Sequence, residues 1–437
     1  MTPAKFLPPL PGGPFLVAVA ILAAAFLILG MLPWSRAGTL WRPSRPALEQ
    51  RAAANWDGDL IQKGKDYRSN GYGRYFFRKG FIGLLLVLVI VAGWHRYLRL
   101  LPGTGGVVGM TAALVLTLAI LDLVHLPFGL AAWDNARRVG LSTQGIGSWL
   151  LDWAKAILLD WPFTALVGAV LFFLIARMPR IWPLPATLLA GAGGVILILL
   201  VPLVIDPLFN KFTPLVDPKL SASFLELARK GGVPAQEVLV SDASRRTTAV
   251  NAYFTGIGPT RRIVVFDTMI EKLTPKESEL VLAHEVGHWA RNHIVLGLVL
   301  GTLGLGVGLL LFQALTGHFV RHRWFGINGP LDPAAAPVYV LLYWLGLFLA
   351  MPLENGISRK FEREADQFAL DLTRDPVTQL KVEVSLARTN LSDVVPPPFI
   401  EALLYTHPKT LDRMTHAQEW AAAHGVPLEP ADPITNP

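Results

Sequence analysis

The chain contains no cysteine, and only 16% of its 437 residues are charged. The absence of cysteine excludes disulfide bonds, a catalytic thiol and metal sites built on thiolates. Ordinary soluble domains carry about 25% charged residues, whereas 52% of this chain is hydrophobic and its mean hydropathy is +0.44. This balance indicates a membrane protein. The net charge is +7, but the basic residues gather in particular segments, so nucleic-acid binding is the weaker explanation of the positive balance.

Apolar residues gather in seven stretches of the length that a bilayer requires, roughly 17 to 25 residues. The first has a longer apolar core than a signal peptide, and no Ala-x-Ala cleavage site follows it, so we expect an uncleaved anchor. The second is short and needs its flank, residues 97–101, to cross the full thickness. The predicted spans are residues 15–32, 81–94, 106–133, 157–176, 184–205, 294–315 and 338–353.

Basic residues between the first two predicted spans indicate how the chain crosses the membrane. Residues 35–80 form the densest basic stretch, and we expect a loop that the positive-inside rule places in the cytoplasm. Seven crossings then place residues 206–292 and the tail after residue 353 in the cytoplasm as well, with the N-terminus outside. Arg359 and Arg363, near the start of that tail, agree with this orientation.

The segment after the fifth predicted span has the pattern of a small folded module. Thr274, Pro275 and Glu277 predict the start of a helix with a capping box, in which the Thr274 and Glu277 side chains bind each other's backbone N–H. Before it, we expect a helix over residues 220–230 and strands over residues 237–241, 249–254 and 262–267.

The helix predicted after Thr274 carries the sequence HEVGH. His284 and His288 are four residues apart, so both imidazoles project from one face and can bind a single zinc ion. Glu285 lies beside them, where its carboxylate can take a proton from a water molecule that the metal activates. Because this short pattern also arises by chance, the metal hypothesis needs a third ligand.

Candidates for the third ligand lie in residues 358–370, which continue from the last predicted span without a helix breaker. Glu362 and Asp366 are four residues apart and share a face. Glu362 could complete the zinc site, while Asp366 accepts a hydrogen bond from the free nitrogen of a ligating histidine. The alternative is a solvated charged face. Two predicted spans separate His288 from Glu362, and an even number of crossings returns the chain to the same side of the membrane.

These motifs together resemble the type I CAAX prenyl proteases, which are integral-membrane zinc endopeptidases of the gluzincin class. The resemblance implies a mainly α polytopic fold, with about seven transmembrane helices around a water-filled chamber and a small α+β zinc-metalloprotease domain on the cytoplasmic side. The motifs that carry it are DPLFNKFTPL (206–215), VNAYFTG (250–256), RRIVVFDTMI (261–270), HEVGH (284–288), ENGISRKFEREAD (354–366) and THPKTLDRM (406–414).

We divide the chain accordingly into four regions. They are an N-terminal membrane region (1–205), a catalytic segment with the sheet and the HEVGH helix (206–293), two transmembrane spans (294–353), and a final region with the Glu-x-x-Ala-Asp helix and the C-terminal tail of the catalytic domain (354–437).

The resemblance also assigns roles to individual residues. It implies that Glu362 is the third ligand of one Zn²⁺ per chain, that Asp366 supports the ligands, and that His407 stabilises the tetrahedral intermediate. The alternative for His407 is a packed or surface histidine. The segment with Asn251, Ala252 and Tyr253 resembles the family's edge strand, where a peptide backbone would lie, and we place Arg413 in the same substrate-binding set. His293, just past the motif, is better explained as an interfacial residue than as a ligand.

The implied function is hydrolysis of peptide bonds near the C-terminus of prenylated or otherwise hydrophobic peptides, by zinc-activated water with Glu285 as general base. We expect a multi-pass monomer of the inner or plasma membrane, if the source is bacterial. Its catalytic site would face the cytoplasm, and its partners would be the lipid bilayer and a peptide or protein substrate, with no nucleic acid.

Three other classes compete with this interpretation. A quality-control metalloprotease of the HtpX type shares the histidine motif but should have fewer spans and broad unprenylated substrates. An intramembrane site-two protease would bury the motif in an apolar span, whereas Lys276, Glu279 and Arg291 flank it here. An inactive scaffold or transporter would bind no zinc.

Overall fold

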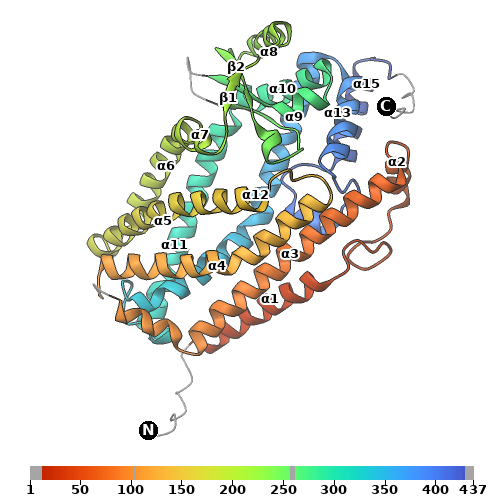
Figure 1. Ribbon diagram of the computed structural model, residues 1–437. Coiled ribbons are helices and arrows are strands. Elements are labelled where there is room, and N and C mark those ends of the chain that lie inside the picture. The colour runs from red at the N-terminus through yellow and green to blue at the C-terminus, as the bar shows by residue number, and fades with distance from the viewer. Residues whose placement is uncertain (1–11, 102–104, 256–260, 429–437) are drawn as a thin grey trace.

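Long helices form one part of the protein, and a small sheet with shorter helices forms the other (Figure 1). The structure is a computed structural model that describes residues 12–101, 105–255 and 261–428. Its mostly helical chain confirms the mainly α, polytopic architecture expected from the sequence. The long helices are α1 (Gly13–Met31), α3 (Gly58–Val91), α4 (Val107–Arg138), α5 (Ile146–Arg177), α6 (Pro183–Leu200), α11 (His293–Arg321) and α12 (Ala336–Thr373).

Six helices in the described part of the chain are long and apolar enough to cross a membrane. A seventh crossing is reached if α3 and the 3₁₀ helix η1 (Trp94–Leu100), which meet at a bend of 69°, count as one span. This agrees with the predicted number of spans. The chamber that the resemblance implies stays a prediction.

The second span bends where its predicted flank begins. The expected flank, residues 97–101, lies almost wholly in η1, and it does not continue α3 in a straight line because Gly93 adopts a positive φ of 76°. Helix α3 itself begins at Gly58, after Asp57 caps it by accepting a hydrogen bond from the backbone nitrogen of Leu60 at 2.7 Å. Much of the basic stretch predicted as a loop is therefore helical.

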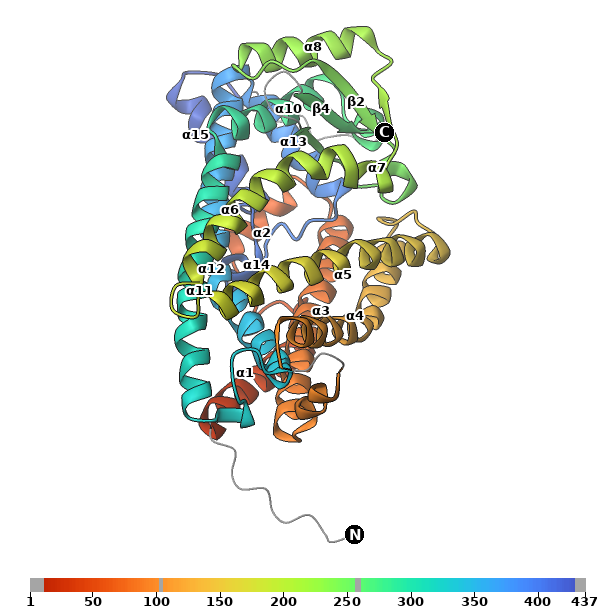
Figure 2. The ribbon, with the colours of Figure 1, turned by 90° about the vertical axis from the view of Figure 1, so that its left-hand side faces the viewer.

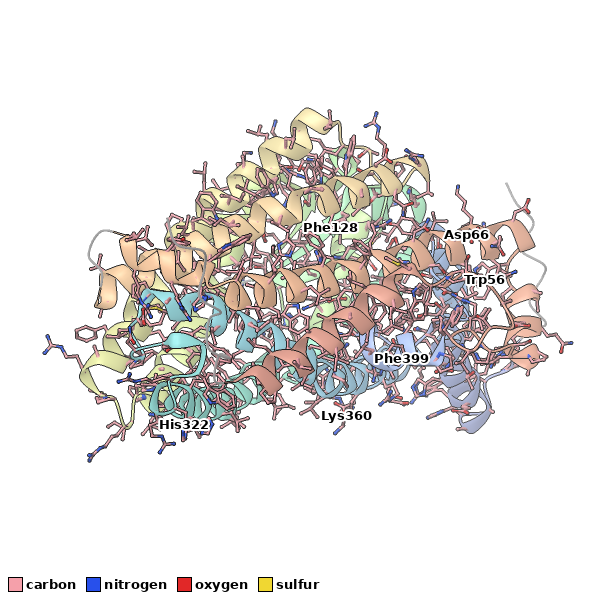
Figure 3. The ribbon with its side chains drawn as sticks, turned by 90° about the horizontal axis from the view of Figure 1, so that it is seen from below. Trp56, Asp66, Phe128, His322, Lys360 and Phe399 are labelled. Atoms are coloured by element: carbon pink, nitrogen blue, oxygen red, sulfur yellow. The ribbon has the colours of Figure 1, made fainter. Side chains whose placement is uncertain are left out.

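The upstream half of α3 reaches the end of the protein that holds α2 (Pro46–Ala53). Figure 3 shows Asp66, on α3, beside Trp56 at this end, while His322, just after α11, lies at the opposite end. Helix α3 can pack closely on α1 because glycines lie where the backbones meet. A Cβ added at Gly80 would lie 2.4 Å from the carbonyl oxygen of Ala23.

Helix α12 connects the membrane part to the sheet part as one rod, and it lies beside α11 toward the left of Figure 2. It continues without a break from Ala336 to Thr373, so the helix predicted over residues 358–370 is confirmed. Its first turns are buried among neighbouring helices, with Leu341 and Trp344 almost inaccessible. Its last turns carry Glu362 and Asp366.

Four strands form a sheet in the order β1-β2-β4-β3. The strands are β1 (Phe212–Pro214), β2 (Glu237–Ser241), β3 (Ala252–Thr255) and β4 (Arg262–Phe266). β2 and β4 are parallel at the centre, while β1 and β3 pair antiparallel at the two edges. The edge position of β3 places its outer backbone where another chain can pair with it.

The predicted strands compare with this sheet as follows. The strand at 237–241 is confirmed; the one expected at 249–254 runs instead over β3, and the one expected at 262–267 ends one residue early because Asp267 begins α9 (Asp267–Lys272). β1 has no predicted counterpart, since three residues carry no alternating pattern. Gly256, the last residue of the VNAYFTG motif, lies outside the described residues.

The sheet packs between helices that complete the catalytic part. Phe224 of α8, Ile263 of β4 and Leu282 of α10 are fully buried and belong to one core. The predicted helix at 220–230 is thus confirmed as α8, beginning two residues earlier. The helices of this part are α7 (Asp206–Phe209), α8 (Pro218–Lys230), α10 (Pro275–Ala290), α13 (Pro376–Thr389), α14 (Pro398–Leu404) and α15 (Thr410–Ala423). The turn η2 (Val201–Ile205) leads into α7, and η3 (Ala243–Arg245) precedes β3. In the membrane part, η5 (Trp324–Gly326) and η6 (Pro333–Ala335) connect α11 to α12.

Three charged residues in or beside the predicted spans have partners on other elements. Asp122 of α4 accepts a hydrogen bond from Trp161 Nε1 at 2.9 Å. Asp152 of α5 binds Arg246 Nε at 2.8 Å, which ties this helix to the loop before β3. Lys155 donates to the Leu208 carbonyl oxygen at 3.2 Å. Pairing between elements therefore offsets part of the cost of placing these groups near lipid.

Candidate metal centre

Helix α10 begins where the sequence predicts. The Thr274 hydroxyl accepts a hydrogen bond from the Glu277 backbone nitrogen at 3.3 Å, and the Glu277 carboxylate accepts one from the Thr274 backbone nitrogen at 2.8 Å, which confirms the capping box. Three residues before the helix ends, Gly287 meets α12 so closely that a Cβ there would lie 3.1 Å from the Ala365 Cα. This crossing brings the histidine face of α10 against the carboxylates of α12.

Three predicted ligand atoms converge at the crossing. His284 Nε2 lies 3.1 Å from His288 Nε2 and 3.2 Å from Glu362 Oε2, and His288 Nε2 lies 3.5 Å from Glu362 Oε1. Two ligands about 2.0–2.1 Å from a zinc ion at a tetrahedral angle lie about 3.4 Å apart. The three side chains therefore have the spacing that one zinc ion requires.

The polarity of the cluster also fits a cation. Glu362 is 6% exposed, and its Oε2 atom has no hydrogen bond within the described residues, although His284 Nε2 is near. A buried carboxylate oxygen without a donor is costly. A metal ion placed among the three side chains would satisfy this oxygen and both imidazole nitrogens together.

Asp366 binds the His284 ring nitrogen that faces away from the other two ligands. The His284 Nδ1–H donates to Asp366 Oδ1 at 2.8 Å, so that in the neutral ring Nε2 is the nitrogen without a proton, which can bind a metal. Arg413, from α15, donates to both oxygens of the same carboxylate, at 2.5 and 2.8 Å. Its remaining nitrogen lies 3.0 Å from Glu383 Oε1. Arg413, expected in the substrate-binding set, thus has its guanidinium held between two buried carboxylates, although it also lines the cavity described below.

His288 has a support that the sequence analysis did not identify. His293 Nδ1 lies 3.1 Å from His288 Nδ1, and His293 Nε2–H donates to Glu364 Oε2 at 3.0 Å. The His293 ring also stacks on Phe361, with centroids 4.4 Å apart, and is 4% exposed. Expected as an interfacial residue, His293 is instead buried against α12. Nothing in the local pattern indicates this contact, because it depends on the turn at Asn292, where φ is 57°.

Glu285 lines a cavity of about 560 Å³ beside the three converging side chains. Burial raises the pKa of the Glu285 carboxyl to about 7, and Glu362 adds to the rise, while the charge on His284 opposes it. A carboxyl group in this range can exchange a proton near neutral pH. The same cavity is lined by Asn251, which precedes the edge strand β3, and by His407.

His407 and the edge strand flank the cluster. His407 lies in the loop between α14 and α15, and its Nε2 is 3.3 Å from Glu362 Oε2 while most of its ring is exposed. The exposed Asn251 side chain accepts a hydrogen bond from the Ala252 backbone nitrogen at 3.0 Å. Ala252 packs into the core under the sheet, and the Tyr253 hydroxyl donates to Asp206 at 3.4 Å. The structure thus gathers the predicted residues at one place, except the side chains of Ala252 and Tyr253.

Comparisons with known proteins agree with this geometry. The family model described as "Peptidase family M48" matches residues 214–421, and one described as "CAAX prenyl protease N-terminal, five membrane helices" matches residues 43–211. The metalloprotease YhfN of Bacillus subtilis is 34% identical over 312 residues, which cover 71% of this chain and 73% of that protein. CAAX prenyl protease 1 of Saccharomyces cerevisiae is 29% identical over 299 residues, covering 64% of this chain and 65% of that protein.

The fold agrees as well. The crystal structure of S. mikatae Ste24p superposes with a TM-score of 0.81 over 94% of this chain and 100% of that one, at 24% sequence identity. With the histidine motif and the converging carboxylate, these matches show that the chain belongs to peptidase family M48, as an integral multi-pass membrane metalloendopeptidase related to the CAAX prenyl proteases.

Proposed function

We propose that the protein is a zinc-dependent endopeptidase in which His284, His288 and Glu362 hold one zinc ion. The observation that supports this most directly is the spacing of their ligand atoms, 3.1 to 3.5 Å, around a buried carboxylate oxygen without a donor. When bound, zinc would polarise the scissile carbonyl group and lower the pKa of a water molecule to about 7.

Three residues around the ligands would support the reaction. Glu285 would accept a proton from the attacking water and pass it to the leaving amine nitrogen. His407, at the open side of the cluster, would donate a hydrogen bond to the oxyanion that forms on the carbonyl carbon. Asp366 would keep His284 in the tautomer that exposes Nε2.

The substrate would bind as an added strand. β3 lies at the edge of the sheet, and Asn251, which precedes it, lines the same cavity as Glu285. Pairing through main-chain hydrogen bonds would tolerate varied side chains. We further propose that this site faces the cytoplasm, because the basic residues of α3 and of the last turns of α12 lie on the sheet side of their apolar segments.

The substrate class follows from the named relatives and from the membrane setting. Several relatives are named CAAX prenyl protease 1 or its homologues. We propose hydrophobic peptides cut near their C-terminus, with prenylated Cys-a-a-X peptides as the first class to test.

The test compares two forms of one peptide, with the C-terminal Cys-a-a-X cysteine either farnesylated or free. The zinc-loaded full chain in detergent or proteoliposomes is incubated with each form, and the products are identified by mass spectrometry. We expect release of the last three residues, faster from the farnesylated form, and slower by about 100-fold or more with the Glu285→Gln variant. Cleavage at scattered positions with no preference would point to broad quality-control proteolysis instead, and no cleavage of either form would refute the proposal.

A further inference from the structure

Three arginine or lysine side chains line the described wall of the cavity that holds Glu285, and their partners differ. Arg413 is paired with Asp366 and Glu383, and Lys409 with Glu401 and Asp412, so carboxylates neutralise both. Arg68, on α3, forms no ion pair with any carboxylate of the described residues. It is therefore a cation of the cavity wall whose charge the neighbouring chain does not compensate.

Neutral groups hold Arg68 in place. Its Nη2 donates to the Asn390 carbonyl oxygen at 2.8 Å, and its Nε donates to the Leu391 carbonyl oxygen at 3.1 Å. A guanidinium group has five N–H donors in a fixed plane, so these two bonds orient it and leave further donors for a ligand. Such a preoriented fork is suited to bind a carboxylate.

Asn390 also connects Arg68 to the start of the edge strand. Its side-chain oxygen accepts a hydrogen bond from the Val250 backbone nitrogen at 3.3 Å. Val250 precedes Asn251, so Arg68 is joined through a single residue to the N-terminal end of β3. A peptide that pairs antiparallel with β3 runs in the opposite direction. Its own C-terminal end would then point toward Val250 and Arg68.

From this arrangement we propose that Arg68 binds the α-carboxylate at the C-terminus of the peptide substrate. The inference rests on the proposed function and extends it, because it makes the free chain end part of what the site recognises. A carboxylate bound at Arg68 would determine how far from the end of the chain the peptide is cut. The enzyme would then favour peptides with a free carboxylate over internal bonds of long chains.

The test uses one cleavable peptide in two forms, with a C-terminal carboxylate or a C-terminal carboxamide. For the zinc-loaded wild-type chain, we expect kcat/KM to be higher for the acid by about 10-fold or more, as for the loss of a hydrogen bond to a charged group. In Arg68→Met, kcat/KM should fall for the acid and change little for the amide. Lys63→Met is the matched control, since Lys63 is an exposed cation on the same helix.

The outcomes distinguish binding of the peptide carboxylate by Arg68 from a purely structural role of this residue. Equal kcat/KM values for the acid and the amide in the wild type would overturn the proposal. So would an equal fall of kcat/KM for both peptides in Arg68→Met, since an arginine with only a structural role affects both peptides alike. The latter result would also be expected if Arg68 bound a lipid phosphate instead of the peptide.

Peptide binding to the zinc-loaded Glu285→Gln variant, measured by fluorescence anisotropy, decides the question without hydrolysis. Tighter binding of the acid, lost when Arg68→Met is added, supports the carboxylate site. Equal binding of both forms rejects it. Absence of hydrolysis by the wild type would refute the proposed function, while the binding ratio would still decide the role of Arg68.

Discussion

His284 and Asp366 are joined by a hydrogen bond of 2.8 Å between α10 and α12, although 82 positions separate them in the sequence. Asp366 is 2% exposed, and Arg413 holds both of its oxygens. The carboxylate therefore cannot turn away, and the imidazole it binds is held with Nε2 toward Glu362. This pair explains why the extension of α12 past its membrane span is needed to build the centre.

Replacing Asp366 by Asn should weaken zinc binding or peptide hydrolysis by about 10 to 100-fold, because the amide is a poorer acceptor for the His284 N–H. Zinc affinity is measured by competition with a chelator of known affinity. Glu226→Gln, at an exposed site on α8, serves as the control. Unchanged affinity and activity would assign Asp366 to structure alone.

Glu362→Gln should remove zinc from the purified protein, because two imidazoles remain where a charged oxygen completed the set. Zinc content per chain is measured by inductively coupled plasma mass spectrometry. Glu354→Gln, exposed on the same helix, should keep one zinc per chain. Full zinc occupancy in the Glu362 variant would mean that another residue is the third ligand.

Glu285→Gln should keep zinc bound while hydrolysis falls by about 100 to 10,000-fold, the usual contribution of a general base. The amide has nearly the same shape but cannot accept the proton from water. The measurement is kcat alongside zinc content of the same preparation. Retained turnover with bound zinc would remove Glu285 from the mechanism.

His293→Leu should lower zinc affinity by about 10 to 100-fold, because His288 Nδ1 loses its partner. His293→Gln offers an amide oxygen as a replacement acceptor, so part of the affinity should return. Chelator competition on both variants tests this. Equal affinities in wild type and His293→Leu would show that His288 needs no support from His293.

Asp393→Leu should destabilise the fold, because it leaves Arg42 buried without its partner, which lies 2.5 Å away. Breaking a buried ion pair from one side costs about 3–5 kcal/mol of unfolding free energy. The double variant Arg42→Met/Asp393→Leu should lose less, since no charge stays buried. Unfolding in detergent compares the three proteins, and an unaffected single variant would contradict the expectation.

Features that depend on nearby residues could be predicted from the sequence. The capping box at Thr274, the strand at 237–241, the helix over 358–370 and the shared face of His284 and His288 depend on spacings of a few residues. The apolar composition and the number of spans depend on local hydropathy in the same way. Where local signals are weak, the sequence was less informative: much of the stretch expected as a loop is helical in α3, and the three-residue strand β1 was not predicted.

A membrane protein with a histidine pair able to bind a metal could be recognised from the order of the amino acids. Which groups meet that pair depends on the folded chain. The crossing of α10 and α12 at Gly287 sets Glu362 and Asp366 against the histidines, the turn at Asn292 places His293 behind His288, and α3 carries Arg68 to Asn390, 322 positions away. Helical periodicity acts over a few residues, whereas these contacts depend on how distant helices pack, and that packing is a property of the whole folded chain.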